Sequence, residues 1–193
     1  MGITVIDTDQ LVHQLLASDK STIKDIVQQF GEGVLSQDTP AGAPSSEVPD
    51  SDQPTEKPID RKKLAQIVFA AEDARRKLEH IVHPNTIMAL RKQLNDLQHQ
   101  PLVAVLVPLL FESNLQGEYD QIWTVYTAEE TLRKRLKERD KLSEAEIDSR
   151  LKAQMPQEQK VKLASQVIDN SFSEAETERQ VKLLVEKILP PVA

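Results

Sequence analysis

The chain has 193 residues, of which 28% are charged and 39% hydrophobic, a balance typical of one globular domain with a buried core. It contains no cysteine, which excludes disulfides and thiolate metal sites, and its net charge of -7 argues against a general nucleic-acid or anionic-membrane binder. The longest apolar run, residues 102–111, is about half of what crosses a bilayer, and no signal-peptide pattern precedes it, so we expect a cytoplasmic protein.

The first predicted element is a strand, residues 3–6, that runs into two acids, Asp7 and Asp9. Open α/β sheets build their sites at the carboxyl ends of strands, and alternation along the strand would place both acids on one side there. A carboxylate at that edge can accept a proton from a hydroxyl or help to hold magnesium. The alternative is that the two acids cap a helix that begins near Gln10.

Two helices and an insertion follow. Leu11, Leu15 and Leu16 have helical spacing, and a second helix is predicted from Thr22 to Gly31. Residues 38–58 contain five of the eleven prolines, carry a charge of -4 and have almost no large apolar side chain. Such a segment cannot bury enough surface to offset its ordering entropy, so we predict a disordered insertion.

From residue 60 the pattern is helical again, with one helix from Asp60, a second that closes at Pro84, and a third over residues 85–97. Residues 102–111 then read as a strand buried on both faces, and further strands are predicted at 121–127 and 166–171. Helices lie between these strands, which predicts a parallel sheet with helices on its faces. Capping boxes that mark helix starts are formed by Thr127 with Glu130, Ser143 with Glu146 and Ser173 with Glu176.

Three further stretches contain candidate functional residues. Residues 107–112, VPLLFE, would place apolar residues and Glu112 at the sheet edge, or would simply be core. Residues 133–141 hold six basic residues, and Arg135 and Arg139 share a helix face that suits phosphate, unless they form a solvated face paired with Glu138 and Asp140. His83 at a helix end favours the helix dipole. No spacing indicates a metal site, and no G-x-x-x-x-G-K-[ST] motif is present.

Taken in order, the blocks VIDTDQLVHQLL, IDRKKLAQIVF, ARRKLEHIVHP, VPLLFE, RLKERD and VIDN resemble the dephospho-CoA kinase family. The resemblance implies a P-loop-kinase-like α/β fold over residues 1–193, with a helical substrate region at about 60–100 and lid helices at about 128–160. It implies transfer of the ATP γ-phosphoryl group, with Mg²⁺, to the ribose 3′-hydroxyl of dephospho-CoA. The residues it assigns are Asp9 as catalytic base with Asp7 beside it, His13, His83, Pro108, Leu109 and Leu110 toward the substrate, Arg135 and Arg139 in the lid, and Asn170 near the adenine.

The family pattern begins with a strand and a glycine-rich phosphate loop that these residues do not contain, so we expect an N-terminally truncated form that lacks the central strand. Phosphoryl transfer depends on positioning the phosphates, and we therefore expect this chain to bind ATP poorly and to turn over slowly. Two alternatives are a degenerate, non-catalytic module that binds the same substrate and a kinase for another nucleotide. The sequence does not indicate the oligomeric state.

Overall fold

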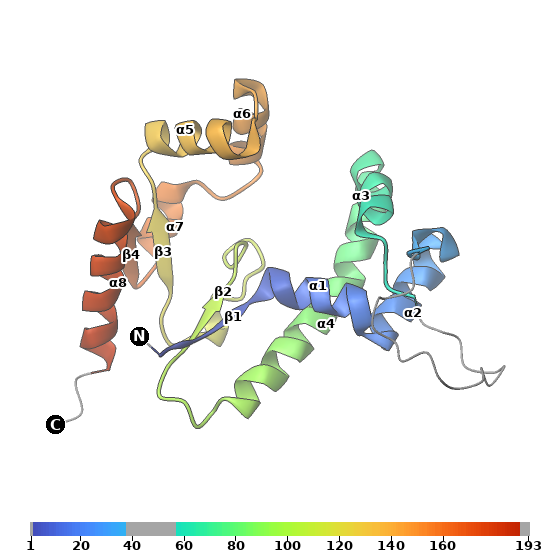
Figure 1. Cartoon of the computed structure of the whole chain (residues 1–193), viewed down its shortest axis with the longest axis horizontal. Coiled ribbons are helices and arrows are strands. Elements are labelled where there is room, and N and C mark those ends of the chain that lie inside the picture. The colour runs from blue at the N-terminus through green and yellow to red at the C-terminus, as the bar shows by residue number, and fades with distance from the viewer. Residues whose placement is uncertain (1, 38–56, 190–193) are drawn as a thin grey trace. The chain divides into compact units, whose positions relative to one another are not determined.

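The structure, a computed structural model, describes residues 2–37 and 57–189 (Figure 1). It divides into two compact units, Met1–Val107 and Pro108–Ala193, which are described separately below. Both units contain parallel strands with helices packed on them, which confirms the predicted α/β class. No helix in the described part of the chain is long and apolar enough to span a membrane.

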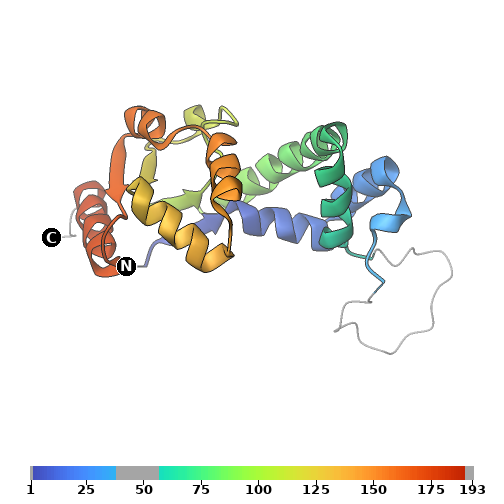
Figure 2. The ribbon, with the colours of Figure 1, turned by 90° about the horizontal axis from the view of Figure 1, so that it is seen from above.

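The first unit is built on one parallel strand pair and a group of helices. β1 (Thr4–Asp7) pairs with β2 (Val103–Leu106), with Asp7 opposite Leu106. The helices are α1 (Thr8–Ser18), α2 (Lys20–Phe30), the short η1 (Glu32–Val34), α3 (Arg61–Ala70) and α4 (Glu72–Asp96). α1 and α4 run side by side from the strand pair toward α2 and α3 (Figure 2). The helices predicted over residues 11–16 and 22–31 are thereby confirmed.

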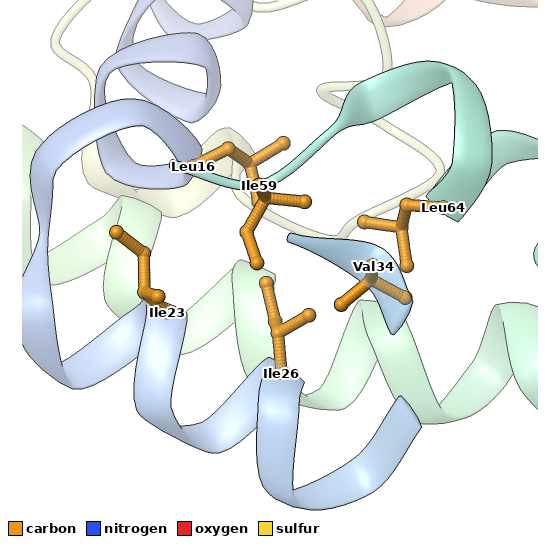
Figure 3. Packing of buried hydrophobic residues seen from close by; sticks show 6 residues of the cluster. All are labelled: Leu16, Ile23, Ile26, Val34, Ile59 and Leu64. Carbon is orange, nitrogen blue, oxygen red and sulfur yellow. The ribbon is translucent and has the colours of Figure 1, made fainter. Parts of the chain in front are cut away.

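Two apolar clusters hold this unit together. Figure 3 shows the larger one, in which α1, α2, η1, α3 and the segment before α3 contribute the buried residues Leu16, Ile23, Ile26, Val34, Ile59 and Leu64. Ile26 and Val34 are completely buried. The smaller cluster packs α1 and α4 onto one face of the strand pair, through Ile6, Leu11 and Leu90. The apolar spacing of α1 therefore has its predicted role, because Leu11 and Leu16 point into the two clusters.

The prediction that residues 102–111 form a strand buried on both faces is wrong. Only Val103–Leu106 are strand, and Leu106 is 53% exposed. Within the described residues β2 pairs with β1 alone, and Val5 on β1 is also 55% exposed. The helices of the first unit therefore leave these side chains uncovered. The chain then leaves the strand, because residues from Pro108 onward form turns.

The prediction of two separate helices around Pro84 is also wrong, because α4 runs through this proline without a break. A proline within a helix removes one hydrogen bond and costs about 3 kcal/mol. Packing on both sides of Pro84 compensates for this cost. Ile81 and Val82 contact the larger cluster before it, and Leu90 belongs to the smaller cluster after it. Tertiary contacts here override the local preference of the sequence.

The ends of the predicted insertion meet each other. Leu35 and Ile59 form an antiparallel bridge, and the Ser36 amide donates to the Pro58 carbonyl at 2.9 Å. The Ile59 amide also donates to the Leu16 carbonyl at 2.9 Å, which ties the bridge to α1. Of the segment predicted to be disordered, residues 38–56 lie outside the described part of the chain.

The second unit contains the other strand pair. β3 (Trp123–Tyr126) and β4 (Gln166–Asp169) are parallel, with Tyr126 opposite Asp169, which confirms two predicted strands. The described strands thus form two two-stranded parallel ladders, β1–β2 and β3–β4. The helices are η2 (Gln116–Glu118), α5 (Glu129–Asp140), α6 (Glu144–Lys152), α7 (Gln157–Leu163) and α8 (Glu174–Ile188).

The three predicted capping boxes have different outcomes. Ser143 and Glu146 form the complete reciprocal box at the start of α6, as predicted. Ser173 accepts from the Glu176 amide at 3.3 Å at the start of α8. The box at Thr127 is wrong, because Ala128 is the N-cap residue of α5 and no side chain caps that helix.

Candidate active site

The two acids after β1 have different positions and different partners. α1 begins at Thr8, so Asp7 is its N-cap residue, and one carboxylate oxygen of Asp7 accepts from the Asp9 amide at 2.9 Å and the Gln10 amide at 3.4 Å. The capping alternative is therefore correct for Asp7. Asp9 lies in the first turn of the helix and not on the strand, so the predicted alternation of the two acids along a strand is wrong.

Asp9 has an exposed side chain. No hydrogen bond or ion pair holds its carboxylate within residues 2–37 and 57–189. His13 follows four residues later and is also exposed, so the two side chains share one face of α1. The Thr8 hydroxyl donates to the Leu106 carbonyl at 2.9 Å and fixes the start of α1 against the end of β2. This edge of the strand pair presents an unpartnered carboxylate and an imidazole, which can accept a proton from a hydroxyl and bind a polar group.

His83, the other predicted histidine, lies on the exposed surface of α4. Because α4 continues to Asp96, His83 is thirteen residues from the end of the helix. The interpretation of His83 as a charge at a helix C-terminus is therefore wrong, since the helix dipole acts mainly within the last turn.

The predicted turn Pro108-Leu109-Leu110 opens the second unit. Leu109 is 45% exposed, whereas Phe111 is buried. The alternative that these residues are simply core is therefore correct for Phe111 and wrong for Leu109. The turn is closed by backbone hydrogen bonds from Ser113 to the Leu109 carbonyl at 3.0 Å and from Leu115 to the Leu110 carbonyl at 3.1 Å. These bonds present Pro108 and Leu109 at the surface.

Glu112, the acid at the end of this stretch, has structural partners. Its carboxylate accepts from Lys160 Nζ at 2.9 Å and from the Met155 amide at 2.9 Å. Burial raises the pKa of Glu112, but these two hydrogen bonds outweigh it, and the pKa lies below its usual value. Glu112 thereby joins the 108–115 turn to the connection between α6 and α7.

Arg135 binds the loop that follows β4. Its guanidinium donates to the Asn170 carbonyl at 2.7 Å and to the Phe172 carbonyl at 3.1 Å. Asn170 is fixed in turn, because its amide donates to the Tyr126 carbonyl at 2.8 Å and its side-chain oxygen accepts from the Thr177 hydroxyl at 3.0 Å. Two predicted nucleotide-binding residues, Arg135 and Asn170, are therefore in direct contact.

Arg139 has a different environment, although it shares the α5 face with Arg135. Its exposed guanidinium forms a two-point pair with Asp140, at 2.7 and 2.9 Å, and Arg150 also donates to Asp140 at 2.9 Å. The hydrogen bond from Arg139 holds the pKa of Asp140 below its usual value. Arg139 therefore lies on a solvated, ion-paired face in this structure, which is the alternative that the sequence left open.

Sequence patterns gave no indication of two glutamines that hold the strand ends. Gln157 accepts from the Thr127 amide at 3.0 Å and donates to the Thr127 carbonyl at 3.1 Å. Gln180 makes the same two contacts with Asp169, each at 2.9 Å. A glutamine amide carries a donor and an acceptor, so each side chain replaces a neighbouring strand at the ends of β3 and β4.

The described residues contain no group of three or more His, Cys, Asp or Glu side chains that could hold a metal ion. Within this part of the chain the donor set does not by itself fit a protein-built metal site. A magnesium ion in kinases is held mostly by substrate phosphates and water, with one or two carboxylates.

The chain is similar to known proteins over most of its length. The sequence model of the dephospho-CoA kinase family matches residues 54–176. The dephospho-CoA kinase of Geobacter metallireducens is 38% identical over 186 residues, which cover 95% of this chain and 84% of that protein. The dephospho-CoA kinase of Carboxydothermus hydrogenoformans is 33% identical over 189 residues, which cover 97% and 83%.

Solved structures give the same result. A crystal structure of a Thermus thermophilus protein is similar with a TM-score of 0.70 at 29% identity, over 96% of this chain and 85% of that one. The dephospho-CoA kinase of Campylobacter jejuni has a TM-score of 0.64 at 28% identity, over 97% and 86%. With the family model and these relatives in agreement over most of its length, the chain belongs to the dephospho-CoA kinase family.

Proposed function

We propose that this protein phosphorylates the ribose 3′-hydroxyl of dephospho-CoA with ATP, the last step in the synthesis of coenzyme A, and that these 193 residues do so slowly because they contain no glycine-rich phosphate loop. Family membership supports the reaction class. The observation that carries the proposal is the unpartnered carboxylate of Asp9 at the edge of the β1–β2 pair. Its neighbour Asp7 caps the helix through one carboxylate oxygen, so Asp9 is the acid of this pair with neither oxygen engaged within the described residues.

Asp9 acts as the base in this proposal. The ribose oxygen forms a bond to the γ-phosphorus, the bond between that phosphorus and the bridging oxygen of ADP breaks, and the hydroxyl proton goes to the Asp9 carboxylate. Asp7 fixes the first turn of α1, which positions Asp9. The substrate-facing residues are His13 and His83 in the first unit and Pro108, Leu109 and Leu110 in the second.

The nucleotide-binding residues are Arg135, Arg139 and Asn170. Arg139 is exposed, and its two-point contact with Asp140 has the geometry that guanidinium uses for phosphate, so it can exchange a carboxylate for a phosphoryl group. Arg135 holds the Asn170 loop, where the adenine is proposed to lie. Mg²⁺ is part of the proposal as a companion of ATP, and no step is assigned to it.

Titration calorimetry with dephospho-CoA tests the proposal. We expect saturable binding with one site per chain. Asp9→Asn should bind dephospho-CoA with nearly unchanged affinity, yet form less product with ATP, as measured by mass spectrometry. Asp96→Asn, an exposed change at the end of α4, is the control. A folded chain that binds no dephospho-CoA would refute the proposal, and binding without any product would favour the non-catalytic alternative. A cytoplasmic location and a single-domain organisation stay predictions.

A further inference from the structure

A groove in the first unit has no role in the site described above. It lies between α2 and α4 and consists of two neighbouring hollows of about 440 and 350 Å³. Both hollows are lined by Gln29, His80 and Ile81, so they form one continuous groove along α4. The larger one also borders Asp25 and Pro84.

On the α4 side of the groove, His80 offers two hydrogen-bond acceptors, its backbone carbonyl and a ring nitrogen. Pro84 has no amide hydrogen, so it cannot donate to the His80 carbonyl four residues earlier, the partner that carbonyl would have in a regular helix. The His80 ring is oriented by a 2.8 Å contact between Nδ1 and the Arg76 carbonyl. A carbonyl only accepts, so Nδ1 carries the hydrogen and Nε2 of the neutral ring is an acceptor.

The α2 side offers both donors and acceptors. Asp25, Gln28 and Gln29 line the larger hollow, and their side chains have no hydrogen bond or ion pair within the described residues. Across the groove the Asn85 amide nitrogen donates to the buried Thr22 hydroxyl at 3.0 Å, which holds α2 and α4 together. The walls are therefore fixed, while their amide and carboxylate groups are available to a ligand.

We infer that this groove binds the pantetheine arm of dephospho-CoA, an inference that rests on the proposed function. The arm contains two secondary amides, and each has an N–H for the acceptors at His80 and Asp25 and a carbonyl for the glutamine amides. Charges of both signs line the groove, Asp25 and Asp73 beside Arg76 and Lys77, so its lining suits an uncharged polar arm better than a ligand of one charge.

The position of the groove relative to Asp9 agrees with the shape of this substrate. Asp9 is at the start of α1, whereas α2 follows the end of α1. The 11 residues of α1 span about 16 Å. A ligand that reaches from Asp9 to the groove must be long, with its reacting hydroxyl at one end and its amides at the other, as in dephospho-CoA.

Two variants test the inference against one control. Gln29→Leu removes a donor and an acceptor from the groove, and we expect the Kd for dephospho-CoA to rise about fivefold, the loss of roughly one hydrogen bond. Pro84→Ala returns an amide to the His80 carbonyl, so it should raise the melting temperature and yet weaken dephospho-CoA binding. A merely structural role of Pro84 would not give these opposite changes. Lys24→Ala, exposed on α2 outside the groove, should change neither quantity.

Pantetheine alone, which lacks the nucleotide, gives an independent measurement on the 193-residue chain. In ¹H–¹⁵N NMR titrations we expect its shifts at residues 25–29 and 80–85. Chemical-shift changes confined to other segments, or no changes at all, would overturn the inference. It would also be overturned if Gln29→Leu and Pro84→Ala bound dephospho-CoA as tightly as Lys24→Ala does. If wild-type protein binds dephospho-CoA and the variants follow the control, the groove assignment fails while the proposed function stands. If the folded wild type binds no dephospho-CoA, both fail.

Discussion

Replacing Asp19 with alanine should destabilise the first unit more than loss of an ordinary helix cap. Asp19 is the N-cap residue of α2, and one carboxylate oxygen accepts from the Thr22 amide at 2.8 Å, the Thr22 hydroxyl at 2.7 Å and the Ser21 hydroxyl at 2.7 Å. Loss of a cap costs about 0.5–2 kcal/mol. Thr22 is completely buried, and a buried hydroxyl without its acceptor costs about 1–3 kcal/mol more. We expect a loss of about 3 kcal/mol in the free energy of unfolding.

Comparing the urea unfolding of Asp19→Ala and Asp60→Ala separates the cost of a lost helix cap from the cost of a buried hydroxyl without an acceptor. Asp60 caps α3 through the Lys62 and Lys63 amides at 3.0 and 3.2 Å and has no buried hydroxyl among its partners. Its loss should cost about 1 kcal/mol. Equal losses for the two variants would refute the reasoning, because they would mean that the buried Thr22 hydroxyl needs no acceptor.

The same contacts give this unit a dependence on pH. Hydrogen bonds from Thr22 and Ser21 hold the pKa of Asp19 below its usual value. A lowered pKa in the folded state stabilises the protein above the unfolded pKa, and this contribution is lost as the pH falls through the folded value. Asp19→Asn should therefore lose less stability in acid than the wild type, as measured by melting temperatures across the carboxylate range.

The second unit and the start of α1 offer further tests. Glu112→Gln should lower stability at neutral pH but reduce the loss in acid, because the lowered pKa of Glu112 makes its contribution disappear as the pH falls; melting curves across about pH 3–5 test this. Arg135→Lys should speed amide hydrogen exchange in the loop after β4, since lysine cannot bind both carbonyls as a fork, whereas exposed Arg139→Lys should leave that exchange unchanged. Asp7→Ala should cost about 0.5–2 kcal/mol in urea unfolding as a lost cap, and a smaller change would argue that Asp7 does not fix α1.

Burial and periodicity made much of the fold predictable. Leu11, Leu15 and Leu16 are buried on α1 because their spacing places them on one face, and that spacing is visible in the sequence. Pro84 shows where this reasoning stops, because the contacts that keep α4 intact come from helices distant in the chain. Asp9 shows how a small shift matters: α1 starts at Thr8, two residues before the position inferred from the sequence, which moves Asp9 from a strand to a helix.

The sequence suggested candidate residues for the site, but it could not indicate the contacts that these residues make. Arg135 was predicted to meet phosphate, yet its guanidinium binds two backbone carbonyls 35 and 37 residues away. Gln157 pairs with the backbone of Thr127, 30 residues away. Backbone atoms are the same in every residue, so partners of this kind leave no pattern in the sequence from which they could be found.

The bridge between Leu35 and Ile59 should allow the first unit to tolerate an insertion between these two residues. Backbone hydrogen bonds already join the two segments there, and a separate one from the Ile59 amide to the Leu16 carbonyl ties the bridge to α1. Each doubling of the chain length between two joined points costs only about 0.6 kcal/mol in closure entropy. A fluorescent reporter or an affinity tag inserted between residues 38 and 56 would therefore leave the α1–α4 core intact. Such an insertion would allow this protein to be followed in cells.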